Sequence, residues 1–503
     1  MEDFAIMTQV PVLADLLRSK PAQAICLAAQ GSCRRAAVVF GISVLCALAP
    51  SRAGGQTAPN IAALQGLAGV STLLNSAAGR AALSANLKVT SDIQTGAAAQ
   101  PLLMTFPEQQ QQALRDSFIT DGNATELADG LGTKLAEAYQ AKAHYTDAKT
   151  FTSVSPSVAD LIGYTNNLTK SDSNAAKYFF ANATTDGRTG VSQAALAILA
   201  AAGGTTDVFG VAYDRRAGSP GANAFGNSRP FQTEPHLIAF RGDDYFGRPS
   251  HSLDWLRGPN ANLMDSPSYP SGHTTYGYTE AILLAILVPQ RYQQMTARAA
   301  EYGNVRIIMG AHYAMDVVGG RATALHAIAH LLENDPDYVG QTRANPAVDS
   351  MATPFLAKTI VITDYPRALS KARAELQAFL KDACGGSVAS CAAADTGRFK
   401  NAAANEALYV ATQTYRLPIV HSSTADVVED VGKVAPEAGY LLTAAFPSLS
   451  LDEANAILTT TEGPGGGFLD DGSAFGIYSR IDLYAAAGRA ATMAKTKQRQ
   501  AAP

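Results

Sequence analysis

The four residues Pro270-Ser271-Gly272-His273 have types suited to binding an oxyanion and moving a proton beside it. They lie where a polar loop meets an apolar run that begins at Thr274 and predicts a helix. The start of a helix exposes backbone N–H groups, which bind anions. Gly272 lets the backbone approach an anion without a Cβ, and Ser271 offers a hydroxyl donor. For this string alone, an N-cap serine followed by an unrelated histidine is an equal alternative.

A second group of residues, Arg306, His312 and Asp316, has types suited to holding and attacking the same anion. Arginine presents a planar, permanently charged fork that matches phosphate oxygens. His312 and Asp316 are four residues apart, so in a helix they share a face and can form a hydrogen bond. A carboxylate on one imidazole nitrogen leaves the other nitrogen free to attack. A capped surface helix with a chance ion pair is the alternative, which the first motif makes less favourable.

The order Arg-Pro, Pro-Ser-Gly-His and Arg-x5-His-x3-Asp resembles the type 2 phosphatidic acid phosphatase (PAP2) superfamily, which includes bacterial acid phosphatases and vanadium haloperoxidases. The motifs extend from Arg229 to Asp316. The resemblance implies a mainly α-helical bundle of the acid phosphatase–haloperoxidase type, followed by a mixed helical C-terminal appendage. It also implies hydrolysis of a small phosphorylated substrate. The sequence demands no metal and no other cofactor, since no cluster of two carboxylates and a histidine stands out.

The resemblance assigns a role to each motif residue. His312 resembles the nucleophile that forms a phosphohistidine, Asp316 its orienting carboxylate, and His273 the acid that protonates the leaving oxygen and later activates water. The residues that resemble the phosphate-binding pocket are Arg229, Ser271, Gly272 and Arg306. Positioning and electrostatic stabilisation supply most of phosphoryl-transfer catalysis, which agrees with these residue types.

The sequence departs from the family pattern at a lysine. The family has Lys-x6-Arg-Pro, but Ala222 stands where Arg229-Pro230 would require the lysine. Arg215 or Arg216 could supply the charge. The family spacing also fits a second alignment, in which Arg241 takes the place of the lysine and Arg248-Pro249 is the Arg-Pro pair. We prefer Arg229-Pro230, because an aromatic residue, Phe231, follows it as it often does in the family. A second departure is Val305, where the family usually has serine before the arginine.

Length and composition favour a large folded protein that does not bind nucleic acid. The chain has 503 residues, 47% of them hydrophobic, and a net charge of -4. Binding to a phosphate backbone requires a concentrated excess of lysine and arginine. The only basic run is the tail Lys495, Lys497 and Arg499, which we expect to be a solvated, frayed end.

Residues 1–53 have the layout of a signal peptide, with Arg34-Arg35 before the apolar run from Ala36 to Pro50 and cleavage expected after Ala53. The run is shorter than the roughly 20 residues that span a bilayer, so a retained anchor is the weaker alternative. We therefore expect a periplasmic or secreted protein whose mature chain has no integral membrane span. Removing the leader would leave two cysteines, Cys384 and Cys391, as a predicted disulfide.

Helical spacing of apolar residues recurs at Ala194–Ala202, Thr279–Val288 and Ala322–Leu332, whereas strand-like alternation is rare. Glycine, proline, asparagine and serine concentrate in long connections between such segments, where sites are often placed. Composition changes near Asn345. We expect a PAP2-like catalytic domain over 54–345 and a C-terminal appendage with a basic tail over 346–503.

Two other functions fit the same motifs. One is a vanadate-dependent haloperoxidase, in which the pocket holds vanadate with His312 as its ligand. The other is a protein that binds phosphorylated ligands without turning them over. In the phosphatase, vanadate could still bind as a phosphate analogue.

Tyr276, Tyr278 and Trp255 could line a substrate entrance, although aromatic residues beside helices usually pack into cores. The sequence indicates no oligomeric state.

Overall fold

A computed structural model describes residues 55–98, 103–118, 122–147, 150–234, 236–346 and 358–501. Residues from Gly54 onward form one compact unit. The predicted signal peptide and its cysteines Cys26, Cys33 and Cys46 lie outside the described residues. The C-terminal residues Ala502 and Pro503 also lie outside them.

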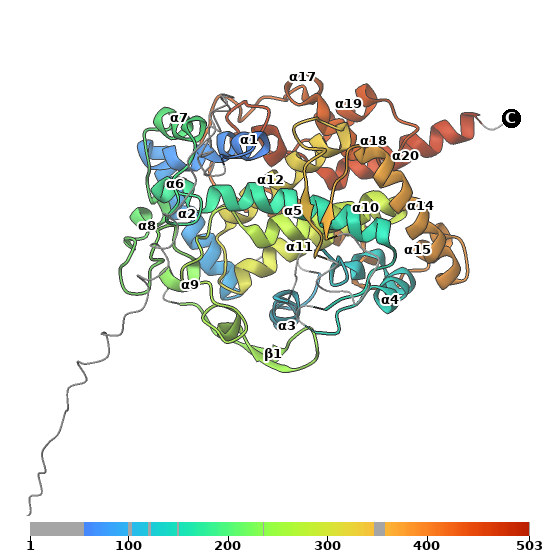
Figure 1. Cartoon of the computed structure of the whole chain (residues 1–503), viewed down its shortest axis with the longest axis horizontal. Helices are drawn as coiled ribbons and strands as arrows, with labels where there is room; N and C mark the ends of the chain where they lie inside the picture. The colour runs from blue at the N-terminus through green and yellow to red at the C-terminus, as the bar shows by residue number, and fades with distance from the viewer. Residues whose placement is uncertain are drawn as a thin grey trace, which may run out of the picture. The chain divides into compact units, whose positions relative to one another are not determined.

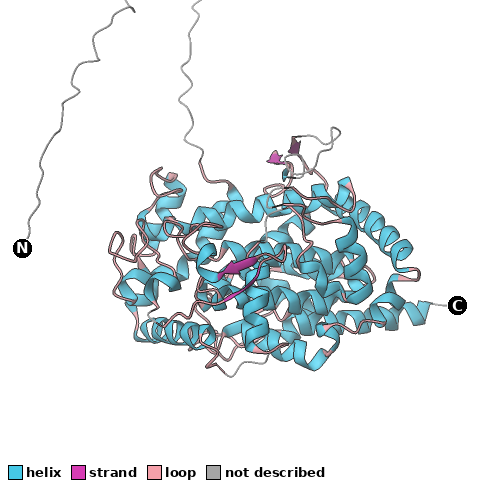
Figure 2. Cartoon of the chain, turned by 90° about the horizontal axis from the view of Figure 1, so that it is seen from below, coloured by secondary structure: helices cyan, strands magenta, loops and turns pink. Residues whose placement is uncertain are grey.

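Helices make up most of the described chain, and the predicted mainly α-helical class is confirmed (Figure 2). The α-helices are α1 (Ala58–Leu67), α2 (Ala77–Gln94), α3 (Phe106–Asp116), α4 (Thr133–Lys142), α5 (Pro156–Lys177), α6 (Phe179–Asn182), α7 (Gln193–Ala201), α8 (Val208–Ala212), α9 (Pro230–Thr233), α10 (Gly272–Leu287), α11 (Tyr292–Ile308), α12 (Ala314–Glu333), α14 (Tyr365–Cys384), α15 (Val388–Ala393), α16 (Ala402–Thr414), α17 (Val431–Val434), α18 (Tyr440–Thr443), α19 (Leu451–Thr461) and α20 (Leu483–Ala501). The three runs with helical spacing lie within or along α7, α10 and α12.

The named strands of the described chain form two short antiparallel pairs. Strand β1 (Arg241–Asp243) pairs with β2 (Pro249–His251), so that Arg241 lies opposite His251. Strand β3 (Arg343–Ala344) pairs with β4 (Thr359–Ile360). Neither pair is long enough to organise a core, so helix packing determines the architecture.

Helix α10 lies at the centre of the core and packs against α5, α11 and α12 (Figure 1). Its apolar stretch from Ala281 to Leu287 is completely buried. Burying a leucine or isoleucine side chain contributes about 1.5 to 3 kcal/mol, which anchors the helix firmly. Fourteen of the sixteen residues of α10 are buried, and the two exceptions are His273 and Tyr276.

A tight connection joins α11 to α12. Gly310 has a φ of +77°, a conformation that glycine adopts without strain. Helix α12 then begins at Ala314, with the Asp316 carboxylate accepting the backbone N–H of its N-cap Tyr313 at 2.9 Å. His312 therefore precedes the helix, and its contact with Asp316 arises from the cap rather than from two positions on one helical face.

The C-terminal helices pack directly on the central ones. Helices α16 and α20 contact α11, and α14 contacts α5. The boundary expected near Asn345 stays a prediction. The basic tail is not frayed as expected, because it continues α20 to Ala501, and Lys497 forms an ion pair with Glu453. The sulfur atoms of Cys384 and Cys391 lie at bonding distance, and the formation of this disulfide in the protein stays a prediction.

None of the helices in the described ranges is, by itself, long and apolar enough to cross a membrane. One sharply bent pair of segments, Ala58–Asn75 with Ala77–Gln94, passes the same length and composition test when the two are taken together.

Candidate active site

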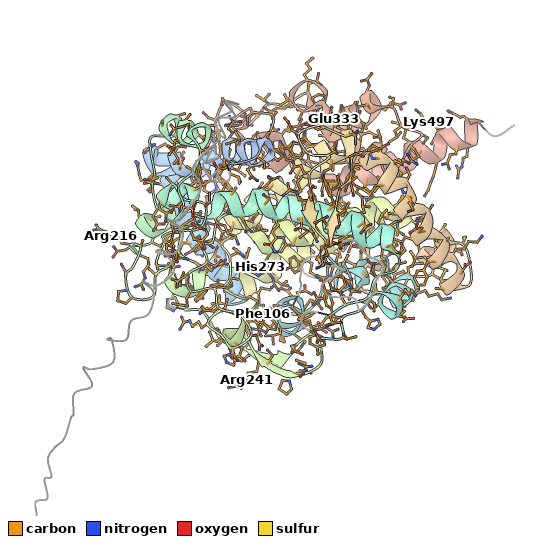
Figure 3. The ribbon with its side chains drawn as sticks, in the orientation of Figure 1. Phe106, Arg216, Arg241, His273, Glu333 and Lys497 are labelled. Atoms are coloured by element: carbon orange, nitrogen blue, oxygen red, sulfur yellow. A yellow bond between two sulfur atoms is a disulfide. The ribbon has the colours of Figure 1, made fainter. Side chains whose placement is uncertain are left out.

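Three helix termini bring the predicted residues together. Arg229 is the N-cap of α9, His273 lies in the first turn of α10, and the connection between α11 and α12 carries His312. Figure 3 labels His273 near the middle of the molecule, whereas Arg216 and Arg241 lie toward its edges. The predicted motifs, which are separate in the sequence, therefore meet at one place.

His312 is completely buried and is held from one side by Asp316. Its Nδ1 atom lies 3.3 Å from Oδ2 of Asp316, and this oxygen also accepts hydrogen bonds from the Tyr313 backbone and from the Ser268 hydroxyl. Because a carboxylate accepts, Nδ1 carries the imidazole proton and Nε2 has its lone pair available. This arrangement is the one that a histidine nucleophile needs.

The free nitrogen of His312 faces the other two predicted groups. Its Nε2 atom lies 3.0 Å from Nδ1 of His273 and 3.1 Å from Nη1 of Arg229. A guanidinium is always a donor, so in this state Arg229 donates to the lone pair of the nucleophile. A bound phosphoryl group would offer that arginine an oxygen instead.

Charge and burial set the protonation of the site. Burial, followed by the positive charge of Arg229, lowers the pKa of His312 well below its usual value, so the imidazole is neutral near pH 7. Burial raises the pKa of Asp316 to about 7, against the opposing effects of the Ser268 and Tyr313 hydrogen bonds and of Arg229. Burial, followed by Arg306, also lowers the pKa of His273 well below its usual value.

Arg229 is a rigid part of the pocket. Its guanidinium donates to the backbone oxygens of Ser266 at 2.5 Å, Ala311 at 2.8 Å and Pro267 at 3.1 Å, and to the Ser266 hydroxyl at 3.0 Å. These bonds connect the loop before α10 to the segment that carries His312. The charge is therefore fixed in position before any ligand binds.

Arg306 lies in the last turn of α11 and is also buried. Its Nη2 atom donates to the backbone oxygen of Ala113 at 3.0 Å, and its guanidinium lies 4.9 Å from the ring centre of Tyr302. Its buried Nε has no hydrogen-bond partner among the described residues. Val305, which replaces the usual serine, is packed into the core, so Arg306 keeps its place without that hydroxyl.

Ser271 and Gly272 lie at the start of α10, directly before His273. The Ser271 hydroxyl accepts the backbone N–H of Thr274 at 3.0 Å, and the Ser271 backbone N–H donates to the main-chain oxygen of Asp316 at 3.0 Å. Ser271 thus caps α10 and joins it to α12. A Cβ on Gly272 would lie only 3.1 Å from Nζ of Lys177, so the glycine leaves room for that ammonium group.

Lys177, the last residue of α5, brings a positive charge of the kind that the sequence motif lacks close to the two histidines. Its positive charge lowers the pKa of both His273 and His312. Burial, Arg229 and Lys170 in turn lower the pKa of Lys177 to about 7. Ala222 is buried, and the exposed Arg216, Arg241 and Arg248 do not fill this role.

The sequence prediction missed Lys177 because a long segment containing α6, α7 and α8 separates it from Arg229. Asn227 brings the two ends of that segment together. Its side-chain amide donates to the backbone oxygens of Lys177 at 3.2 Å and Tyr269 at 2.8 Å, and its side-chain oxygen accepts the Tyr269 N–H. The only signal in the sequence was a lysine at the end of a helix with a buried face, which is too common to identify a site.

The two histidines of the neighbouring loops and two of the aromatic residues expected at a substrate entrance are exposed, buried in the core or held by structural hydrogen bonds. His236 is exposed, and Nδ1 of His251 accepts the Leu253 N–H at 3.1 Å. Tyr278 is buried in the core, and the Trp255 indole donates to the Ser250 hydroxyl. Tyr276 alone of the aromatic candidates stands beside the site, with its hydroxyl 3.2 Å from the position of a Cβ on Gly272.

Comparison with known proteins agrees with this geometry. Residues 194–335 match the PAP2 superfamily. A non-specific acid phosphatase of Salmonella typhimurium is 42% identical over 69 residues, which cover 14% of this chain and 28% of that protein. An acid phosphatase of Zymomonas mobilis is 42% identical over 71 residues, which cover 14% and 26%. A non-specific acid phosphatase of Providencia stuartii is 36% identical over 90 residues, which cover 18% and 35%.

The aligned part thus spans about a quarter to a third of the length of these relatives. Lys177 lies before the matched segment, whereas Arg229, His273, Arg306, His312 and Asp316 all lie within it. The segment 194–335, which carries the predicted nucleophile, acid and arginine clamp, is thus the part of the chain that is similar to the PAP2 superfamily.

Proposed function

We propose that this protein is an exported phosphomonoesterase that acts through a phosphohistidine on His312. The observation that supports this most directly is the position of Nε2 of His312, which lies 3.0 Å from His273 and 3.1 Å from Arg229, with Asp316 on the opposite nitrogen. The acid phosphatases to which part of the chain is similar make this activity the first to test. Export rests on the signal-peptide layout of residues 1–53.

The reaction proceeds in two steps. In the first, Nε2 of His312 attacks phosphorus, the nitrogen–phosphorus bond forms, and the bond from phosphorus to the ester oxygen breaks as His273 protonates that oxygen. In the second, His273 removes a proton from water, the water oxygen attacks phosphorus, and the nitrogen–phosphorus bond breaks to release phosphate. A positioned acid or base of this kind contributes about 10² to 10⁴-fold to the rate.

Positive charge around the phosphoryl group supplies the remaining stabilisation. The charges of Arg229, Arg306 and Lys177 all act on the two histidines, and Asp316 is the carboxylate that contacts His312. A phosphate dianion in the pocket offsets the excess of positive charge. It also raises the pKa of His273, which gives that residue the proton it needs as an acid. The expectation that no metal is required stays a prediction.

The test is the His312→Ala variant, assayed for release of phosphate from an aryl phosphate. We expect loss of turnover, with unchanged activity in the matched control His236→Ala, whose exposed side chain has none of the contacts that hold His312. In the parent protein, brief mixing with labelled substrate should trap label in an acid-labile, base-stable form. Near-normal turnover by His312→Ala would contradict the mechanism.

The position of Lys177 also supports a second candidate, a vanadate-dependent haloperoxidase. Vanadate would be held by His312 with Lys177, Arg229 and Arg306 around its oxygens, and it would supply peroxide activation. Bromination with vanadate and peroxide, measured against phosphate release on the same sample, separates the two activities. A protein that only binds phosphate would gain thermal stability from phosphate and show neither activity.

A further inference from the structure

The accessible side of α10 carries a second polar group next to His273. Every residue of this helix except His273 and Tyr276 is buried. Residues three apart in a helix are neighbours on its surface, so the Tyr276 side chain lies one turn beyond the predicted acid. Its hydroxyl approaches Gly272 from the same side as the Lys177 ammonium, at 3.2 Å and 3.1 Å from one Cβ position. Tyr276 therefore borders the phosphoryl pocket.

A second lysine lies against this tyrosine. Lys170 is two turns before Lys177 on α5, and its Nζ atom lies 5.8 Å from the ring centre of Tyr276. Its charge also reaches Lys177, whose pKa it helps to lower. Both lysines and the tyrosine are only partly buried, which leaves them accessible to a ligand. The positive charge thus extends outward from the pocket along one side.

We infer that Lys170 and Tyr276 form a subsite for a second phosphate group, carried by the leaving alcohol of the substrate. The inference rests on the proposed function, because the first phosphate occupies the pocket at His312. An ammonium group favours any nearby dianion, and the tyrosine hydroxyl can donate to one of its oxygens. The favoured substrates are then organic bisphosphates, from which only the phosphate beside His312 is removed.

A matched pair of substrates tests this directly: propane-1,3-diol bisphosphate and 3-hydroxypropyl phosphate. They share the alcohol and differ only in the second phosphate. For the parent protein we expect a lower KM for the bisphosphate. Well below pH 7, where Lys177 is charged in both proteins, Lys170→Gln should raise that KM by about fivefold, as for a partly exposed ion pair, and leave the KM of the monophosphate unchanged. Tyr276→Phe should raise the bisphosphate KM by a smaller factor.

The control is Lys371→Gln, which removes an exposed lysine from α14 and should change neither KM. Raising the salt concentration should reduce the preference for the bisphosphate in the parent protein but not in Lys170→Gln. Equal effects of Lys170→Gln on both substrates, or equal KM values for the parent protein, would overturn the subsite.

Binding to the His312→Ala variant separates this inference from the proposed function. Calorimetry on that variant needs no turnover, so the bisphosphate preference and its loss in His312→Ala/Lys170→Gln can be measured even if the parent protein hydrolyses neither compound. Hydrolysis without a preference in binding for the bisphosphate would refute only the proposed subsite. A preference in binding without any hydrolysis would refute the proposed phosphatase activity and support the subsite.

Discussion

The Nδ1 atom of His273 lies 3.0 Å from the Nε2 atom of His312, so the predicted acid and the predicted nucleophile are in direct contact. An in-line displacement at phosphorus requires the attacking nitrogen and the leaving oxygen on opposite sides. The proposed mechanism therefore requires His273 to rotate away from His312 when a phosphoryl group binds between them. It can do so because it stands on the accessible side of α10, whereas His312 is completely buried.

This division of roles predicts how His273→Ala responds to the leaving group. With phosphate esters of poorly acidic alcohols we expect kcat to fall by about 10² to 10⁴-fold, because the leaving oxygen then departs without a proton. With esters of acidic phenols the fall should be much smaller. A series of aryl and alkyl phosphates measures the slope, and equal losses across the series would show that His273 is not the acid.

Lys177 predicts the alkaline limit of activity. Its pKa is lowered to about 7, so its charge is present below pH 7 and is lost as the pH rises through that value. Since this charge attracts the phosphate, kcat/KM should fall above about pH 7. In Lys177→Arg the charge persists, and the decline should move to higher pH. Ionisation of the substrate is common to both proteins, so an unchanged alkaline limb in Lys177→Arg would refute the assignment.

Asp316→Asn should leave the fold intact while reducing kcat by about 10² to 10⁴-fold. An amide in that position can donate to Nδ1, which stabilises the imidazole tautomer with a proton on Nε2 and blocks its attack. Ser268→Ala removes only one of the hydrogen bonds to the carboxylate and serves as the milder comparison. Circular dichroism confirms the fold, and full activity of Asp316→Asn would argue against an orienting role.

Gly320 of α12 controls how closely α12 approaches the start of α10. A Cβ at this position would lie 2.5 Å from the backbone oxygen of Ser271 and 3.0 Å from Cβ of Thr274. Gly320→Ala should therefore destabilise the protein by about 1 to 3 kcal/mol and reduce activity, despite the better helix propensity of alanine. Gly190→Ala, whose new Cβ would meet no atom within 4 Å, is the control in denaturant unfolding. Equal stability of the two variants would show that α12 can move aside.

The local features of the site were predictable because they depend on short-range chemistry. A serine before an apolar run predicts a helix N-cap, and Ser271 is the N-cap of α10. The apolar runs predicted the helices around the site, and the mainly α-helical class followed from them. The spacing of His312 and Asp316 predicted their contact, although the cap of α12 produces it rather than a shared helical face.

The sequence by itself was therefore enough to predict the nucleophile, its carboxylate, the acid and the arginine clamp. All of them lie between Arg229 and Asp316, in motifs whose order and spacing resemble those of the family. Only the tertiary structure showed that Lys177 is a cation close to the two histidines. Lys177 reaches the pocket because α5 packs against α10 and because Asn227 joins the end of α5 to the loop before α10. Contacts between segments so far apart depend on how whole helices pack, and no local spacing in the chain encodes that.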